Sequence, residues 1–238
     1  MLITRNDRIV TWELNRPGQD NGLDIATFQA MESSLTELEH EAQRLNCLLV
    51  YGGLTVFSTG LDSELLKICF GDAAIFHEVV ERLNRVLDRL EALPFISIAC
   101  IEGLCKLGGL ELALACDLIV AGESAMISDG HLAYDAMPGG GATRRLPPRL
   151  GYSGSLRFIL QRETLTATEA CKRGLVDEAV PRGQAPLRGK AIAEALSKRH
   201  PSLVHGIKTS LRAAAPRVPT RREAEEFQRT VIDRLGSR

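Results

Sequence analysis

The alternation of apolar and polar residues near the N-terminus is typical of a β-hairpin. In residues 9–14, Val10, Trp12 and Leu14 would share one face of a strand, with polar side chains on the other face. The pair Asn6-Asp7 precedes this segment and favours a turn. We therefore expect the strand to form a hairpin with residues 2–4.

Apolar positions at helical spacing predict two helices in the first half of the chain. Asp24 is a suitable N-cap for a helix that runs to about residue 45. A second helix is expected over residues 73–93, and Pro94 closes it.

Short apolar runs between and after these helices indicate buried strands. We expect strands over 47–51, 95–101 and 118–121, and an unusually apolar helix over 108–116. Strands that alternate with helices favour an α/β fold with a partly parallel sheet. From about residue 156 the pattern is mainly helical, with helices expected over 167–173, 187–198, 202–213 and 221–235 and a turn over 216–219.

Composition narrows the class of protein. The 238 residues are 45% hydrophobic, and 29 basic against 30 acidic residues leave a net charge of −1. This balance argues against a dedicated nucleic-acid surface. The basic residues Arg217, Arg221 and Arg222, interleaved with Glu223, Glu225 and Glu226, are interpreted as a charged helix face.

Cysteine spacing and apolar run length bear on metals and location. The six cysteines form no CxxC pair, which excludes the usual zinc spacings. Most of them stand beside apolar residues, which predicts buried free thiols. The N-terminus has no apolar signal core, and no apolar stretch reaches the roughly 18 residues of a membrane helix. We expect a cytoplasmic protein with no membrane partner.

Two loops are candidates for chemistry, at residues 56–62 and 103–109. Each follows a buried strand and leads toward a helix, and ligands in open α/β sheets collect at such strand ends. Backbone N–H groups at a glycine turn can approach a developing oxyanion closely. Tight turns without a ligand are the plain alternative.

Glu111 is the candidate acid or base beside the second loop. It follows Gly108 by three residues, so both would lie on the same face of a helix. A carboxylate within so apolar a helix is costly unless it is paired or used. Backbone N–H groups of the first helical turn are an equally good reason for its presence.

The motifs of the chain, taken together, resemble those of one family. The segment 57–62 is similar to F-x-x-G-x-D, and 101–121 is similar to a glycine-rich loop, helix and C-D-x-x-x-A segment. Segments 14–23, 138–146 and 174–181 resemble L-N-R-P…N-x-L, P-x-x-G-x-x-x-R-L and G-L-V-x-x-V-V-P. These motifs occur in the order found in the crotonase superfamily of enoyl-CoA hydratases and isomerases.

The resemblance implies a fold and an assembly. We expect an α/β protein of the crotonase (ClpP-like) fold, a spiral of ββα units in residues 1–185. A helical C-terminal trimerisation region would follow in residues 186–238, and the protein would form a homotrimer or hexamer.

The resemblance also implies a reaction type. Such proteins bind acyl thioesters, of coenzyme A or an acyl carrier, and stabilise an enolate. Coenzyme A would be part of the substrate, with no separate cofactor and no metal. The N–H groups of Leu61 and Gly108 would form an oxyanion hole, and Glu111 would be catalytic. Further substrate-binding residues would be Thr59, Gly60, Gly109, Tyr134 and Lys67.

The sequence departs from the family at two positions. His131 stands where typical hydratases carry a second carboxylate, and it would act as the second catalytic group. Leu107 stands where glycine is common, which would narrow the acyl pocket or change the path of the backbone. Lys67 and Lys208 stand where basic groups could meet the phosphates of coenzyme A.

Several reactions remain open at this stage. Hydration or dehydration is expected first, then isomerisation, then decarboxylation. A β-diketone C–C hydrolase that uses His131 to activate water is one alternative, although the P-G turn at 138–141 lacks the Asp of such enzymes. A binding or assembly homologue that has lost catalysis is the other.

Overall fold

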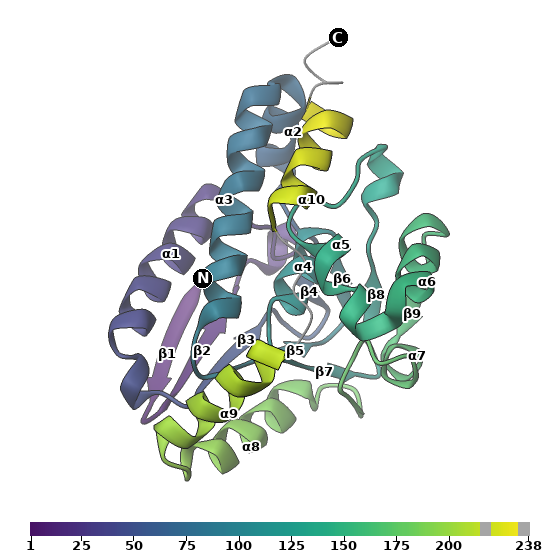
Figure 1. Cartoon of the computed structure of the whole chain (residues 1–238). Helices are drawn as coiled ribbons and strands as arrows, with labels where there is room; N and C mark the ends of the chain where they lie inside the picture. The colour runs from purple at the N-terminus through teal and green to yellow at the C-terminus, as the bar shows by residue number, and fades with distance from the viewer. Residues whose placement is uncertain (215–219, 233–238) are drawn as a thin grey trace.

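Two β-sheets form the centre of the protein (Figure 1). The computed structural model describes residues 1–214 and 220–232. The larger sheet has the strand order β1 (Leu2–Asn6), β2 (Ile9–Glu13), β3 (Cys47–Tyr51), β5 (Ile96–Ile101), β7 (Leu118–Gly122) and β10 (Glu178–Val180). The smaller sheet has the order β4 (Val56–Ser58), β6 (Leu104–Lys106), β8 (Met126–Ser128) and β9 (Thr164–Thr166).

The chain passes from one sheet to the other in a repeating spiral. The pairs β3/β4, β5/β6 and β7/β8 each place their first strand in the larger sheet and their second in the smaller. The first strands pair in parallel with one another, and so do the second strands. This arrangement confirms the predicted spiral of ββα units and the partly parallel sheet.

A glycine makes the sharp bend between β5 and β6 possible. Gly103 has a φ of +61°, and a Cβ atom there would overlap the carbonyl of Thr55. Only glycine adopts this conformation so close to another backbone without strain. The bend directs the following segment toward α4.

The predicted helices are present, with shifted ends. The helices of the described residues are α1 (Ile25–His40), α2 (Ser63–Gly71), α3 (Ala73–Ala92), α4 (Gly108–Leu114), α5 (Ala142–Arg145), α6 (Pro147–Leu160), α7 (Ala167–Lys172), α8 (Ala185–Ser197), α9 (Pro201–Ala214) and α10 (Thr220–Phe227). Of these, α2, α5 and α6 were not predicted. Asp24 caps α1 as predicted and accepts a hydrogen bond from the N–H of Thr27. The helix ends at His40, and a 3-10 turn over Ala42–Arg44 replaces its predicted last residues.

Helices cover both faces of the larger sheet. Leu48 and Val50 of β3 belong to the main core, with residues of α1 and α3. Cys47 and Leu49 point to the opposite face, where α8 packs. A strand that is buried on both faces needs apolar residues at every position, which accounts for the continuous apolar run of β3.

The C-terminal helices pack on this core, with α8 and α9 together at the bottom of Figure 1. On α9, the Nζ of Lys208 lies 2.6 Å from Asp117 Oδ2 and donates to the carbonyl of Phe95 at 2.9 Å. Lys208 is only 5% exposed. The expectation that Lys208 meets a substrate phosphate is therefore wrong, because its ammonium is buried and already paired.

Helix α10 is not simply a charged surface face. Glu223 is buried, and Phe227 packs with the main core. The interpretation of this segment as a charged helix face is thus wrong for Glu223, because tertiary contacts remove its side chain from solvent. Arg217, the turn predicted at 216–219 and the end of the predicted last helix lie outside the described residues.

Two further observations concern surface and burial. All six cysteines carry free thiols, and all except the half-buried Cys171 are buried, as the spacing predicted. Across residues 1–214 and 220–232, no helix combines the length and the apolar character that crossing a membrane requires. The cytoplasmic location stays a prediction.

Candidate active site

The two loops singled out in the sequence come together in space. Gly60 follows β4 with a φ of +86°, and a Cβ atom there would lie 2.6 Å from the nitrogen of Gly108. The N–H of Leu23 donates to the carbonyl of Gly60 at 2.8 Å and fixes this loop from the other side. Gly60 is therefore required because the N-terminus of α4 packs directly against it.

A second glycine allows the same close packing. A Cβ atom at Gly109 would overlap the carbonyl of Ser58, the last residue of β4. Gly60 and Gly109 therefore shape the contact between the loops, whereas Leu61 and Gly108 line the pocket beside it. Thr59, on the same loop, donates its N–H to the carbonyl of Asp20.

Two backbone N–H groups are left without a protein acceptor at this contact. In the part of the chain that the structure describes, neither Leu61 nor Gly108 donates its N–H in a hydrogen bond. Backbone donors in a protein interior normally find a partner. Two unengaged donors at the wall of one pocket are suited to bind an oxygen atom of a ligand.

Leu107 adopts a backbone conformation that is unusual for its residue type. It has a φ of +54° and a ψ of −133°, and it immediately precedes α4. Its N–H donates to the carbonyl of Asp129 at 2.8 Å, and its side chain lines the pocket. A non-glycine residue with these angles stores strain, of about 1–3 kcal/mol. The sequence expectation that Leu107 adds bulk to the pocket agrees with this placement.

Glu111 lies inside the protein with its carboxyl group at the pocket wall. It is 1% exposed, and its Oε1 accepts hydrogen bonds from the N–H groups of Gly140 at 2.7 Å and Ala142 at 3.2 Å. Helix α4 is buried along its whole length, so its apolar neighbours exclude water from this carboxyl. The turn that precedes α5, and not the first turn of α4, holds the side chain.

His131 brings an imidazole beside this carboxyl. Its Nε2 lies 4.0 Å from Glu111 Oε2, and its Nδ1 lies 3.0 Å from Asp129 Oδ2. The backbone N–H of His131 also donates to Asp129 Oδ1 at 3.2 Å. Asp129 is 1% exposed. The imidazole of His131 therefore lies between the carboxyl groups of Asp129 and Glu111, and both His131 and Glu111 line the pocket.

The environment raises the pKa values of both groups. Burial raises the pKa of Glu111 to about 7, and the charges of Glu223 and Asp129 add to this, while the nearby His131 opposes it. Burial works against the imidazolium of His131. The hydrogen bond to Asp129 and the charge of Glu111 outweigh that effect and raise its pKa above the ordinary value. A carboxyl group with a pKa of about 7 can exchange a proton with a ligand near pH 7, and the imidazole beside it is a second proton carrier.

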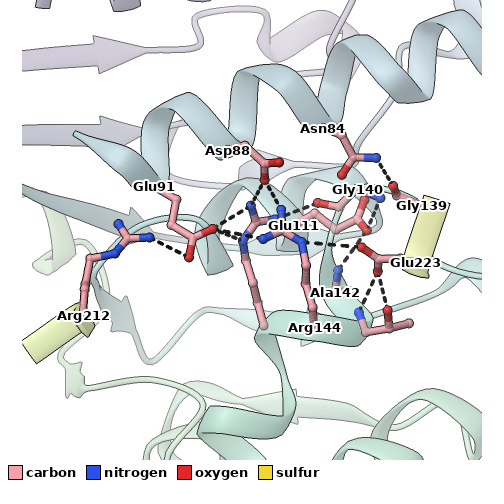
Figure 2. Close-up of polar contacts among 12 residues, drawn as sticks. Asn84, Asp88, Glu91, Glu111, Gly139, Gly140, Ala142, Arg144, Arg212 and Glu223 are labelled. Carbon is pink, nitrogen blue, oxygen red and sulfur yellow. Dashed lines mark hydrogen bonds and ion pairs between the residues drawn. The ribbon is translucent and has the colours of Figure 1, made fainter. Parts of the chain in front are cut away.

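A polar network holds the turn that binds Glu111 (Figure 2). Asn84 of α3 donates to the carbonyl of Gly139, and Arg145 donates to the carbonyl of Gly140 at 2.8 Å. Arg144 and Arg145 also pair with Asp88 and with other acidic side chains around them. The turn is thus fixed through its carbonyl groups, while its N–H groups bind Glu111.

The same turn also binds a carboxylate of the C-terminal helix. Glu223 Oε1 accepts hydrogen bonds from the N–H of Thr143, at 3.0 Å, and from its hydroxyl. The Nε of Arg144 lies 3.7 Å from Glu223 Oε2. Burial raises the pKa of Glu223, and the contacts with Thr143 and Arg144 oppose this. Helix α10 is thereby attached to the segment that positions Glu111.

Comparison with known proteins decides the family. The family model for enoyl-CoA hydratase/isomerase matches residues 4–236, nearly the whole chain. The chain belongs to the enoyl-CoA hydratase/isomerase family. This confirms the predicted membership of the crotonase superfamily.

Individual relatives agree with this assignment. YngF of Bacillus subtilis is 30% identical over 213 residues, which cover 89% of this chain and 80% of that protein. The 2,3-dehydroadipyl-CoA hydratase of Escherichia coli is 29% identical, over 89% and 81% of the two chains. The crystal structure of an enoyl-CoA hydratase from Bacillus anthracis superposes with a TM-score of 0.84, at 27% identity, over 98% of this chain and 90% of that one.

The remaining site residues expected for this family fall in different places. Tyr134 lines the pocket near its surface and is 48% exposed. Lys67 lies outside the pocket lining, on the exposed side of α2, where its Nζ pairs with Glu64 at 2.7 Å. A role for Lys67 in binding the substrate stays a prediction.

Asp129 is a site residue that the sequence reasoning missed. The resemblance to β-diketone hydrolases pointed to an Asp in the turn at 138–141, which this sequence lacks. The acidic partner instead stands two residues before His131, in the sequence Asp129-Gly130-His131. An acidic residue next to an unexpected histidine was the available signal.

Across residues 1–214 and 220–232, no group of three or more His, Cys, Asp or Glu side chains is arranged to hold a metal ion.

Replacing Glu111 by Gln is expected to stabilise the fold at neutral and higher pH. The pKa of Glu111 is about 7 in the folded chain against 4.5 for a model carboxyl. The unfolded state therefore loses its proton first, and the wild type loses stability as the pH rises from about 4.5 through 7. Gln loses no proton, so the gain should reach up to about 3 kcal/mol at pH 8 and vanish below pH 4.5.

The measurement is urea unfolding of both proteins at pH 4 and pH 8. The exposed Glu64→Gln serves as the control, since its stability relative to wild type should not vary in this way. An equal effect of Glu111→Gln at the two pH values would show that the carboxyl is not destabilised by burial.

Proposed function

We propose that the protein adds water to, or removes it from, an enoyl thioester through an enolate intermediate. The observation that carries this proposal is the position of Glu111 and His131 beside the two unengaged N–H groups of Leu61 and Gly108. Relatives named as enoyl-CoA hydratases support this reaction and coenzyme A as the carrier.

The two N–H groups would bind the thioester carbonyl. Negative charge collects on that oxygen when the enolate forms, and donors fixed in advance stabilise it without reorganisation. Loss of one such donor typically costs about 10²–10³ in rate. The close packing of Gly60 against Gly108 keeps both donors on the same wall of the pocket.

Glu111 is the main acid and base in this proposal, and His131 assists it. In hydration, the water oxygen bonds to the β-carbon while one group takes its proton, and the other group gives a proton to the α-carbon. Both events need groups that can take up and release a proton, and a carboxyl with a pKa of about 7 and the imidazole beside it meet this need. Dehydration is the same sequence in reverse.

Asp129 acts as a positioning residue for His131. A carboxylate at Nδ1 fixes the proton on that nitrogen and leaves Nε2 to face Glu111 and the pocket. The charge of Asp129 also favours the imidazolium form. A histidine supported in this way can take the place of the second carboxylate of typical hydratases.

Isomerisation and decarboxylation of an acyl thioester pass through the same enolate. We rank them second and third, after hydration, as the reaction of this protein. The family match does not favour the β-diketone hydrolase or the non-catalytic homologue.

Exchange of the α-proton of an acyl-CoA in D₂O tests enolate formation whatever the final product. Glu111→Gln should lower the exchange rate by about 10²–10⁴, and His131→Gln should lower it less, because Glu111 is the main proton carrier. Exchange is followed by mass spectrometry, with Glu64→Gln as the control. Undiminished exchange in Glu111→Gln would remove Glu111 from the mechanism.

The variant Asp129→Asn tests the support of His131. Without the negative charge the pKa of His131 should fall, so the corresponding limb of the kcat profile should move to lower pH, and kcat should fall by about 10²-fold. Asp135→Asn, which changes an exposed carboxyl in the same segment, is the matched control. A rate loss with an unchanged pH profile would indicate a structural role only.

We propose that the protein associates with further copies of itself through its C-terminal helices. Leu203, Ile207 and Leu211 repeat every four residues along α9 and are 56%, 55% and 68% exposed. Light scattering should give three or six times the 26.0 kDa chain mass. Ile207→Asp should lower that mass, since it places a charge within the apolar face, whereas a monomeric wild type would contradict the proposal.

A further inference from the structure

We infer that the pocket accepts a short, uncharged acyl chain, and that Phe76 and Phe227 set its length limit. This inference rests on the proposed function, because it assigns the substrate class of the same site. It is carried by the volume of the pocket, by the aromatic pair at its buried side and by the charges of its lining.

The pocket is small. It encloses about 60 Å³, whereas a dry cavity of about 150 Å³ is known to take up a benzene molecule. Leu107 occupies part of the space with its side chain, close to the proposed carbonyl site. This space favours a short acyl group of about four carbons over a ring or a long chain.

An aromatic pair closes the buried side of the pocket. Phe76 of α3 and Phe227 of α10 meet edge to face, with ring centroids 5.5 Å apart, and they are 5% and 4% exposed. A Cβ atom at Gly139 would lie 2.7 Å from the Phe227 ring, so this ring has little freedom to move away. A growing acyl chain would have to displace one of the two rings.

A second aromatic pair lies on the solvent side. Phe70 and Tyr134 stack with centroids 6.5 Å apart and are 41% and 48% exposed. Phe70 also meets Phe76 edge to face at 5.7 Å. The exposed pair can move at little cost, whereas the buried pair cannot, so the buried pair limits the length of the chain.

The pocket lining offers no positively charged partner for a substrate that carries a carboxylate on its acyl chain. None of its described residues is Lys or Arg, and its charged groups are Glu111 and His131. Arg144 and Arg145 lie behind the turn and are already paired with acidic side chains. A carboxylate at the far end of the acyl group would be desolvated without a counter-charge and close to Glu111.

The test is kcat/KM for a series of trans-2-enoyl-CoA substrates with four, six, eight and ten carbons, together with a six-carbon substrate that carries a terminal carboxylate. The wild type should prefer the four-carbon over the eight-carbon substrate by at least about 100-fold, since a single methylene misfit in an apolar pocket already changes rates by about 10-fold or more. The carboxylated substrate should be at least about 100-fold poorer than its uncharged six-carbon counterpart.

Two variants test the length limit, and a third serves as their control. Phe227→Ala and Phe76→Leu should each raise the eight-carbon to four-carbon ratio by about 10-fold or more, because each removes part of the buried barrier. Phe158→Leu changes an equally buried phenylalanine outside the pocket and should leave the ratio unchanged. Phe76→Leu keeps the test valid if Phe227→Ala prevents α10 from docking.

Equal rates on all chain lengths, a preference for the carboxylated substrate, or a ratio unchanged in both pocket variants would overturn the inference. If no thioester is turned over and no α-proton exchanges, the proposed function fails, and calorimetric binding of butyryl-CoA and decanoyl-CoA then decides the inference by itself. Tighter binding of butyryl-CoA supports the short pocket, and tighter or equal binding of decanoyl-CoA refutes it.

Discussion

The site depends on one buried carboxyl and the turn that holds it. Two N–H groups, from Gly140 and Ala142, bind Glu111 Oε1, while apolar side chains keep water away. Those two hydrogen bonds keep the side chain in place in either protonation state, because a neutral carboxyl oxygen also accepts. Burial then sets the affinity for the proton, so geometry and acid strength come from different parts of the structure.

The surrounding helices are arranged to keep this turn fixed. Asn84 and Arg145 hold its carbonyl groups, and α3 supplies acidic partners for both arginines of α5 (Figure 2). The two arginines of this network are buried, whereas their partners Asp88 and Glu91 remain partly exposed. The network adds fixed hydrogen-bond partners to a turn that also packs against Phe227, Val80 and Leu83.

Sequence reasoning predicted the elements that apolar periodicity determines. The strand β3 and the helix α3 have long apolar patterns and were placed correctly, and Glu111 stood out because charge is rare in so apolar a helix. The strands β4, β6, β8 and β9 were not predicted, since each has three residues and no periodicity can be read from so few. Their positions follow from the spiral, which only the tertiary structure shows.

Asp129 and Glu223 were missed for another physical reason. Each is a carboxylate in a polar segment, where a solvent-exposed side chain is the ordinary expectation. Asp129 is buried by the turn before His131, and Glu223 is buried by a segment distant in the sequence. Burial of a polar residue depends on partners that a local pattern does not contain.

The Gly140–Thr143 segment links the buried carboxyl of Glu111 to the C-terminal helix α10. The N–H groups of Gly140 and Ala142 bind Glu111 from α4, and the N–H group of Thr143 binds Glu223 from α10. A ligand, a modification or a neighbouring molecule that displaced α10 would therefore remove a negative charge near Glu111 and release one end of its support. The protonation of the buried carboxyl would then report on whether the C-terminal helix is seated.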